Sequence, residues 1–339
     1  MTRRKDQIAR FLEDNGLSCA PCVNLAGDAS NRRYFRLKLP DGKTIVLMDA
    51  PPSKGEDIRP FVRIAKYLRG VGLGAPEIIT QDETNGFLLL EDLGDDLFAR
   101  LAKSQPDLET ELYTAATDLL IELHRHAPPK GLGTYDAQTA AQLAALASDW
   151  YAFGISGTEK TTAQEQLSAE MARLITTHAP ECDVLVQRDY HSENLLWRPE
   201  RTDHHRVGLL DFQDALTGHR SYDLVSLLQD ARRNVPLEIE TKMLDRYIAN
   251  TDQNEEQFKT AYAVWGAQRN LRILGVFARL CMRDGKPGYI AYIPRVWTLL
   301  LRDLAHPKLE SLQTLVMEIL PEPSAKALST LEEKCAQTP

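Results

Sequence analysis

The hydrophobic pattern of this 339-residue chain changes near residues 91–95, and that change restricts the folds open to it. Before it, short apolar or alternating segments are separated by turns. The alternating run 33–39 and the apolar run 44–48 flank such a turn and predict a hairpin. After it, apolar residues mostly recur at helical spacing. We therefore expect an α+β fold, with a β-rich region over 1–92 and a mostly helical region over 96–339.

The β-rich region is expected to contain one main helix. Apolar residues recur at helical spacing from about 57 to 69, with Pro60 near the first turn and Gly70 at the end. Two further strand-like segments, 77–80 and 86–90, follow this helix. The pattern predicts a small sheet whose strands are interrupted by a single helix.

Charge and composition exclude several kinds of protein. Forty Lys and Arg against 48 Asp and Glu give a net charge of −8, which argues against nucleic acid as the main partner. The charged N-terminal segment is not typical of a signal peptide, and no run of 18 apolar residues follows. We therefore expect a cytoplasmic protein with no membrane partner. A separate expectation is that it acts as a monomer. Five cysteines fit reduced thiols, and Cys19 and Cys22 lack the strand-before-helix context of a redox pair.

Three polar residues stand at the ends of short apolar strands between residues 184 and 214. Asp189 follows the strand 184–186, Asn194 comes five residues later, and Asp211 ends a second apolar run. Phosphoryl transfer needs one carboxylate to accept a hydroxyl proton, and an amide and another carboxylate to hold Mg²⁺ on nucleotide phosphates. The alternative is that these are turn and capping residues of a structural hairpin. That alternative gives no common reason for three polar residues at strand ends.

These segments resemble the protein-kinase-like superfamily, in its aminoglycoside phosphotransferase-like branch of small-molecule kinases. The loop 187–194 is similar to the catalytic loop of that branch, with Gln187 where the pattern prefers His, and 210–212 is similar to its metal-binding segment. A closer resemblance is to the anomeric kinases of peptidoglycan recycling, which phosphorylate the C1 hydroxyl of N-acetylmuramic acid and N-acetylglucosamine with ATP. Four segments carry it: 27–36, 47–51, 189–197 and 210–215.

The resemblance covers nearly the whole chain and implies a bilobal fold, in which a small β-sheet lobe and a helical lobe hold ATP between them. The hinge would lie at about 91–95. It implies roles for Asp189 as the base, for Asn194 and Asp211 as Mg²⁺ ligands, and for Asp223 as a support of the catalytic loop. It also implies that these residues bind the nucleotide: Gly27, Ser30, Asn31 and Arg32 over the phosphates, and Glu91 and Leu93 at adenine.

One position departs from the family pattern. The family carries a Lys for the α- and β-phosphates on the strand that here reads Val46-Leu47-Met48. Arg32 and Arg33 are the candidates to replace it, because a guanidinium binds phosphate oxygens in a bidentate fork. The alternative is that both are solvated residues at a hairpin tip.

Positive charge is concentrated near the C-terminus. Residues 262–308 hold eight basic and two acidic residues, a local net charge of +6. Arg269 and Arg272 belong to a helical stripe of this segment, which by default is a solvated face. Because helices of this region wall the acceptor pocket in the resembled branch, we expect Arg269 or Arg272 to bind an anionic amino sugar. His191, two residues past Asp189, is a further candidate for contact with the sugar.

Two rival functions remain open. An aminoglycoside or other small-alcohol kinase would use the same catalytic residues on another acceptor. A pseudokinase-like nucleotide-binding module would explain both the missing Lys and Gln187.

Overall fold

The structure is a computed structural model that describes residues 3–25, 31–158 and 161–337. The chain divides into two compact units. The first comprises Met1–Leu119 and Ser192–Ala215, and the second comprises Leu120–His191 and Leu216–Pro339. The division shows that the segment after the catalytic loop belongs with the sheet. The predicted hinge at 91–95 stays a prediction.

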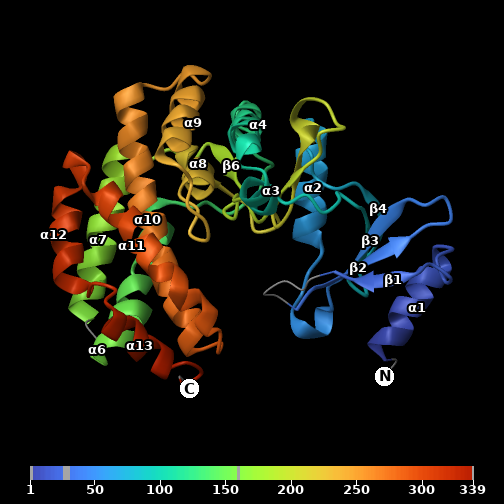
Figure 1. Cartoon of the computed structure of the whole chain (residues 1–339), viewed down its shortest axis with the longest axis horizontal. Helices are drawn as coiled ribbons and strands as arrows, with labels where there is room; N and C mark the ends of the chain where they lie inside the picture. The colour runs from blue at the N-terminus through green and yellow to red at the C-terminus, as the bar shows by residue number, and fades with distance from the viewer. Residues whose placement is uncertain (1–2, 26–30, 159–160, 338–339) are drawn as a thin grey trace. The chain divides into compact units, whose positions relative to one another are not determined.

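A five-stranded antiparallel sheet in the order β1-β2-β3-β5-β4 forms the first unit (Figure 1). Its strands are β1 (Cys22–Asn24), β2 (Arg33–Lys38), β3 (Thr44–Asp49), β4 (Ile78–Asp82) and β5 (Phe87–Glu91). The predicted hairpin is confirmed, since β2 pairs with β3 from Arg33↔Asp49 to Lys38↔Thr44. Directly opposed residues share a face of the sheet, so this register decides which arginine of the β2 strand faces which side.

Helix α1 (Arg4–Asp14) covers one face of this sheet. Its buried Phe11 packs in a core cluster with side chains from three strands: Leu37, Ile45, Leu47, Phe87 and Leu89. The predicted main helix is α2 (Arg59–Gly70), which begins with Pro60 in its first turn, where a missing N–H costs nothing. Its apolar residues are buried as the spacing predicts. The short helix α3 (Phe98–Ser104) follows, and α4 (Glu109–Leu123) contributes residues to both units.

A second hairpin of the first unit is made by β7 (Leu195–Trp197) and β8 (Val207–Leu209). It is fixed to the segment after α2, because the Leu209 N–H donates to the Gly74 carbonyl at 3.1 Å. The approach is so close that a Cβ on Gly74 would collide with the carbonyl of Val207. The rings of Phe61 and Phe212 also pack with centroids 4.8 Å apart. The ends of this hairpin are therefore held rigidly.

The second unit is mostly helical. Its helices are α5 (Ala137–Ala144), α6 (Phe153–Ser156), α7 (Thr161–His178), α8 (Ser221–Leu228), α9 (Leu237–Ala249), α10 (Glu255–Met282), α11 (Ile293–Leu304), α12 (Glu310–Ile319) and α13 (Ala325–Glu333). A two-stranded sheet joins β6 (Val184–Val186) to β9 (Leu216–Gly218). The long helix α10, orange in Figure 1, packs against α5, α8 and α11. Together the sheet and helices confirm the predicted α+β class. No helix within the described ranges is long and apolar enough to span a membrane.

Candidate active site

Asn194 and Asp211 lie at the same end of the β7–β8 hairpin, because the Leu210 N–H donates to the Asn194 carbonyl at 3.0 Å. Asp211 has a φ of +55°, which non-glycine residues rarely adopt and which concentrates at functional sites. Its Oδ1 accepts a hydrogen bond from Gln213 Nε2 at 2.6 Å. The side chains of Asn194 and Asp211 are both partly exposed. An amide oxygen and a carboxylate are ligands that Mg²⁺ accepts, so these two residues fit the metal that the family pattern implies.

The turn before β2 is anchored by one carboxylate. Glu56 Oε2 accepts from Arg32 Nε at 2.9 Å, and Glu56 Oε1 accepts from the Asn31 backbone N–H at 2.9 Å. Burial tends to lower the pKa of Arg32, but Tyr34 and Glu56 together raise it above its usual value, so the guanidinium stays charged. Two other residues predicted to bind phosphate, Gly27 and Ser30, lie outside the described residues.

Arg33 points to the other face of the sheet. It pairs with Asp49, which also accepts from Arg4 Nε at 2.9 Å, and Asp49 is fully buried. Because alternate residues of a strand face opposite sides, Arg33 shares its face with Leu47, and α1 packs on that face through Phe11. Val46 and Met48 face the other way. The geometry therefore favours Arg32 over Arg33 as the replacement cation.

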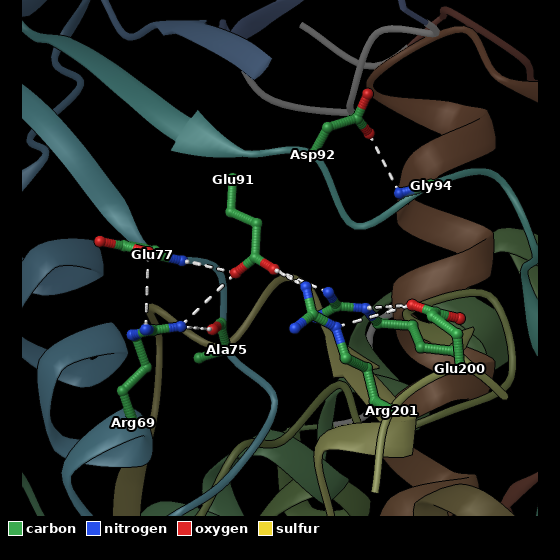
Figure 2. Close-up of polar contacts among 9 residues, drawn as sticks. Arg69, Ala75, Glu77, Glu91, Asp92, Gly94, Glu200 and Arg201 are labelled. Atoms are coloured by element: carbon green, nitrogen blue, oxygen red, sulfur yellow. Dashed lines mark hydrogen bonds and ion pairs between the residues drawn. The ribbon is translucent and has the colours of Figure 1, made fainter. Parts of the chain in front are cut away.

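The side chain of Glu91 is partly exposed and lies in an ion-pair cluster (Figure 2). Its Oε1 accepts from Arg198 Nη2 at 2.7 Å and Arg201 Nη2 at 3.3 Å, and its Oε2 accepts from Arg69 Nη1 at 3.5 Å. Leu93 is buried. Glu91 and Leu93 would therefore contact adenine with their backbone atoms, as the family resemblance implies.

In the second unit, Asp223 holds the backbone of the catalytic loop. Its Oδ2 accepts from the Gln187 N–H at 2.6 Å, and its Oδ1 accepts from the Arg188 N–H at 3.0 Å. Arg188 has a φ of +74°, so the chain bends sharply just before Asp189. Burial raises the pKa of Asp223 to about 7, although both N–H donors lower it. The contacts are those expected of a residue that supports the loop, and they leave Asp189 partly exposed.

His191, two residues after Asp189 in the loop, is buried. Burial lowers the pKa of His191 to about 4, so the ring is neutral at pH 7. Arg232 Nη1 lies 3.3 Å from His191 Nε2. Because a guanidinium only donates, His191 Nε2 accepts this hydrogen bond.

The two arginines of α10 that were predicted to bind the acceptor make their hydrogen bonds with α8 and the residue that follows it. Arg269 is only 4% exposed, and donates to Ser226 Oγ at 2.9 Å and to the Gln229 carbonyl at 3.3 Å. Arg272 is partly exposed and donates to Tyr222 Oη at 2.8 Å. A solvated basic face is therefore wrong for Arg269. Contact of either arginine with an acceptor stays a prediction.

Comparison with protein families identifies the chain. The model of the phosphotransferase enzyme family matches residues 22–259, which is well over half of the sequence. The chain belongs to the phosphotransferase enzyme family. It is therefore an enzyme that transfers phosphoryl groups.

Members of this phosphotransferase family with curated names cover nearly the whole chain. An N-acetylmuramate/N-acetylglucosamine kinase of Caulobacter vibrioides is 36% identical, over 92% of this chain and 95% of its own. A Pseudomonas aeruginosa protein of the same name is 35% identical, over 88% of this chain and 89% of its own. Among solved structures, an ADP-bound aminoglycoside phosphotransferase aligns with a TM-score of 0.57 and 14% identity, covering 98% of both chains. That likeness confirms the protein-kinase-like fold.

Sequence reasoning missed two residues of this phosphotransferase. Glu56 precedes α2 by three positions and carries no motif, although its place just before the main helix of the sheet lobe was a usable signal. Arg232 lies outside the +6 segment, between α8 and α9, so the concentration of charge near the C-terminus did not indicate it. Only the fold brings it to His191.

Proposed function

We propose that this phosphotransferase is an ATP-dependent kinase of the anomeric C1 hydroxyl of an amino sugar, N-acetylmuramate, N-acetylglucosamine or both, in cell-wall recycling. The observation that carries the proposal is the 35–36% identity, over about nine-tenths of each chain, to relatives bearing that kinase name. The residues that phosphoryl transfer requires, Asp189, Asn194 and Asp211, are all present. We place the reaction in the cytoplasm and propose that the enzyme acts on these small molecules as a monomer.

Asp189 is the proposed base or orienting group for the attacking hydroxyl. Its carboxylate would accept the C1 hydroxyl proton as the oxygen attacks the terminal phosphoryl group. An anomeric hydroxyl is more acidic than an ordinary sugar alcohol, so the demand on this base is modest. Asp223 fixes the two preceding backbone amides, which supports a defined direction for the Asp189 side chain.

Asn194 and Asp211 would hold Mg²⁺ on the nucleotide phosphates. The bound ion supplies charge neutralisation between the phosphate oxygens. The close ends of the β7–β8 hairpin and the constrained backbone of Asp211 support this pair of ligands. Arg32, kept charged and directed by Glu56, would add the positive charge that a strand Lys adds in the family pattern.

The test is product identity. The enzyme is incubated with ATP, Mg²⁺ and a panel of free sugars that includes N-acetylmuramate, N-acetylglucosamine and kanamycin. Phosphorylation at C1 removes the reducing end, so product formation should match loss of reducing sugar. A phosphosugar that still reduces would contradict the anomeric assignment. Phosphorylation of kanamycin alone would select the aminoglycoside kinase, and absence of Mg²⁺-dependent turnover would select the nucleotide-binding module.

Asp189→Asn tests the base. Turnover should fall by about 10²–10⁴-fold, the usual contribution of a positioned base. The matched control is Asp41→Asn, an exposed carboxylate in the turn between β2 and β3, which should turn over like the wild type. Wild-type turnover in the Asp189 variant would overturn its assignment.

A further inference from the structure

The loop between α8 and α9 places a cation beside the catalytic loop. Arg232 lies in this loop, and its Nη1 is 3.3 Å from Nε2 of His191. His191 is only two residues past Asp189, so their Cα atoms are at most about 7 Å apart, from the reach of an extended chain. The guanidinium of Arg232 therefore contacts the catalytic loop two residues from the proposed base, within the same compact unit.

The contacts of the Arg232 side chain differ from those of its backbone. Its side-chain hydrogen-bond partner is the His191 ring, which is neutral because burial lowers its pKa to about 4. Within the described part of the chain, no carboxylate forms an ion pair with the Arg232 guanidinium. Asp230 Oδ1 instead accepts from the Arg232 backbone N–H at 2.8 Å, which fixes the loop and leaves the guanidinium available.

Arg232 differs from the two arginines of α10 in the group that its guanidinium contacts. Arg269 is buried and gives its donors to Ser226 and Gln229, and Arg272 donates to the Tyr222 hydroxyl. Arg232 is partly exposed, so a ligand can reach it without unpacking a helix. Arg272 is also partly exposed and bonded to a neutral group, but Arg232 is the one of the three whose guanidinium contacts the catalytic loop, at His191.

We infer that Arg232 binds the carboxylate of the N-acetylmuramate lactyl group and thereby distinguishes this sugar from N-acetylglucosamine. The inference rests on the proposed function. N-acetylmuramate is N-acetylglucosamine with a lactyl ether on O3, two ring positions from the reacting C1, so the two sugars differ only in this anionic substituent. A planar guanidinium binds a carboxylate through two parallel hydrogen bonds. The hydrogen bond to His191 restricts the Arg232 side chain and prepares that fork.

The experiment compares both sugars in the wild type, Arg232→Ala and Arg283→Ala. Loss of a charge-assisted contact should reduce kcat/KM for N-acetylmuramate by about 10- to 100-fold, while the value for N-acetylglucosamine changes little. Arg283 is the matched control, because it is an exposed arginine of the +6 segment paired with Asp284. Its removal lowers the net charge equally and should leave the ratio of the two sugars unchanged. The methyl ester of N-acetylmuramate, which lacks the charge, should be used equally by the wild type and Arg232→Ala.

If kcat/KM in Arg232→Ala falls equally for both sugars, or falls for neither, the inference is overturned. A loss of the same selectivity in Arg283→Ala would also overturn it, since bulk charge would then be responsible. Failure of the proposed function is recognised separately, as absence of turnover of either sugar by the wild type. In that case, calorimetric titration measures the binding of the two sugars without turnover. Tighter binding of N-acetylmuramate by the wild type that is lost in Arg232→Ala supports the inference. Equal binding of the two sugars rejects it.

Discussion

The support of the catalytic loop by Asp223 can be dissected with two substitutions. Asp223 is fully buried, and each of its carboxylate oxygens accepts one backbone N–H, from Gln187 and from Arg188. Asp223→Asn keeps the shape but places an NH₂ group against one of the donors. A buried donor left unsatisfied costs about 1–3 kcal/mol, so the free energy of unfolding should fall by about that amount. Asp223→Ala removes both acceptors, so the free energy of unfolding should fall by about twice as much.

The same substitutions should slow the reaction more than they weaken substrate binding. Gln187 and Arg188 immediately precede Asp189, so loosening their amides displaces the proposed base. Misplacement of a reacting group by about 1 Å costs on the order of 10² in rate. We expect kcat of Asp223→Asn to fall by about that factor, with KM for ATP nearly unchanged.

Urea denaturation at pH 5 and pH 8, together with steady-state kinetics, gives the readout. Burial raises the pKa of Asp223 to about 7, above the ordinary value of the unfolded chain. The stability from this group is therefore present at low pH and is lost as the pH rises through 7. The stability gap between wild type and Asp223→Asn should be larger at pH 5 than at pH 8. A variant as stable and as fast as the wild type would refute the loop-support reasoning.

Two further predictions concern charged residues of the two units. Arg32→Ala should raise KM for ATP or lower turnover by at least about tenfold, as expected for a lost charge-assisted contact, whereas Arg33→Ala should leave ATP kinetics unchanged and reduce stability through Asp49. The opposite pattern in initial-rate measurements would reassign the cation. Burial raises the pKa of Asp303 to about 8, so thermal stability should decline as the pH rises from 5 to 9, and Asp303→Asn should flatten that decline in melting curves. A decline of the same size in the variant would place its origin elsewhere.

Local pattern was sufficient for the sheet and its helix. The alternation over 33–39 set both the β2 strand and its register with β3, because a one-residue slip would have exposed the apolar face. The same alternation already separates Arg33, which shares a face with Phe35, from the residues facing the other way. Which of the two faces α1 covers is shown only by the structure, so alternation alone did not choose between Arg32 and Arg33.

The burial of Arg269 could not be predicted in the same way. Periodicity shows which residues share a face of a helix, but the number of other elements that pack on that helix depends on the whole fold. Helix α10 is surrounded by α5, α8 and α11, so a stripe that would be solvated on a surface helix lies partly inside. The buried charge of Arg269 is tolerated because Ser226 and the Gln229 carbonyl accept its N–H groups.

The distribution of charged residues along the sequence therefore indicates only roughly where an anionic substrate would be attracted. The +6 segment draws anions toward the second unit as a whole, since exposed charges add to its potential. Selection of one sugar over another needs a charge that is accessible, uncompensated and held in one direction. Arg269 is not accessible, and the charge of Arg283 is compensated by Asp284. Arg232 meets all three conditions from outside the segment, because a neutral histidine directs it without cancelling its charge.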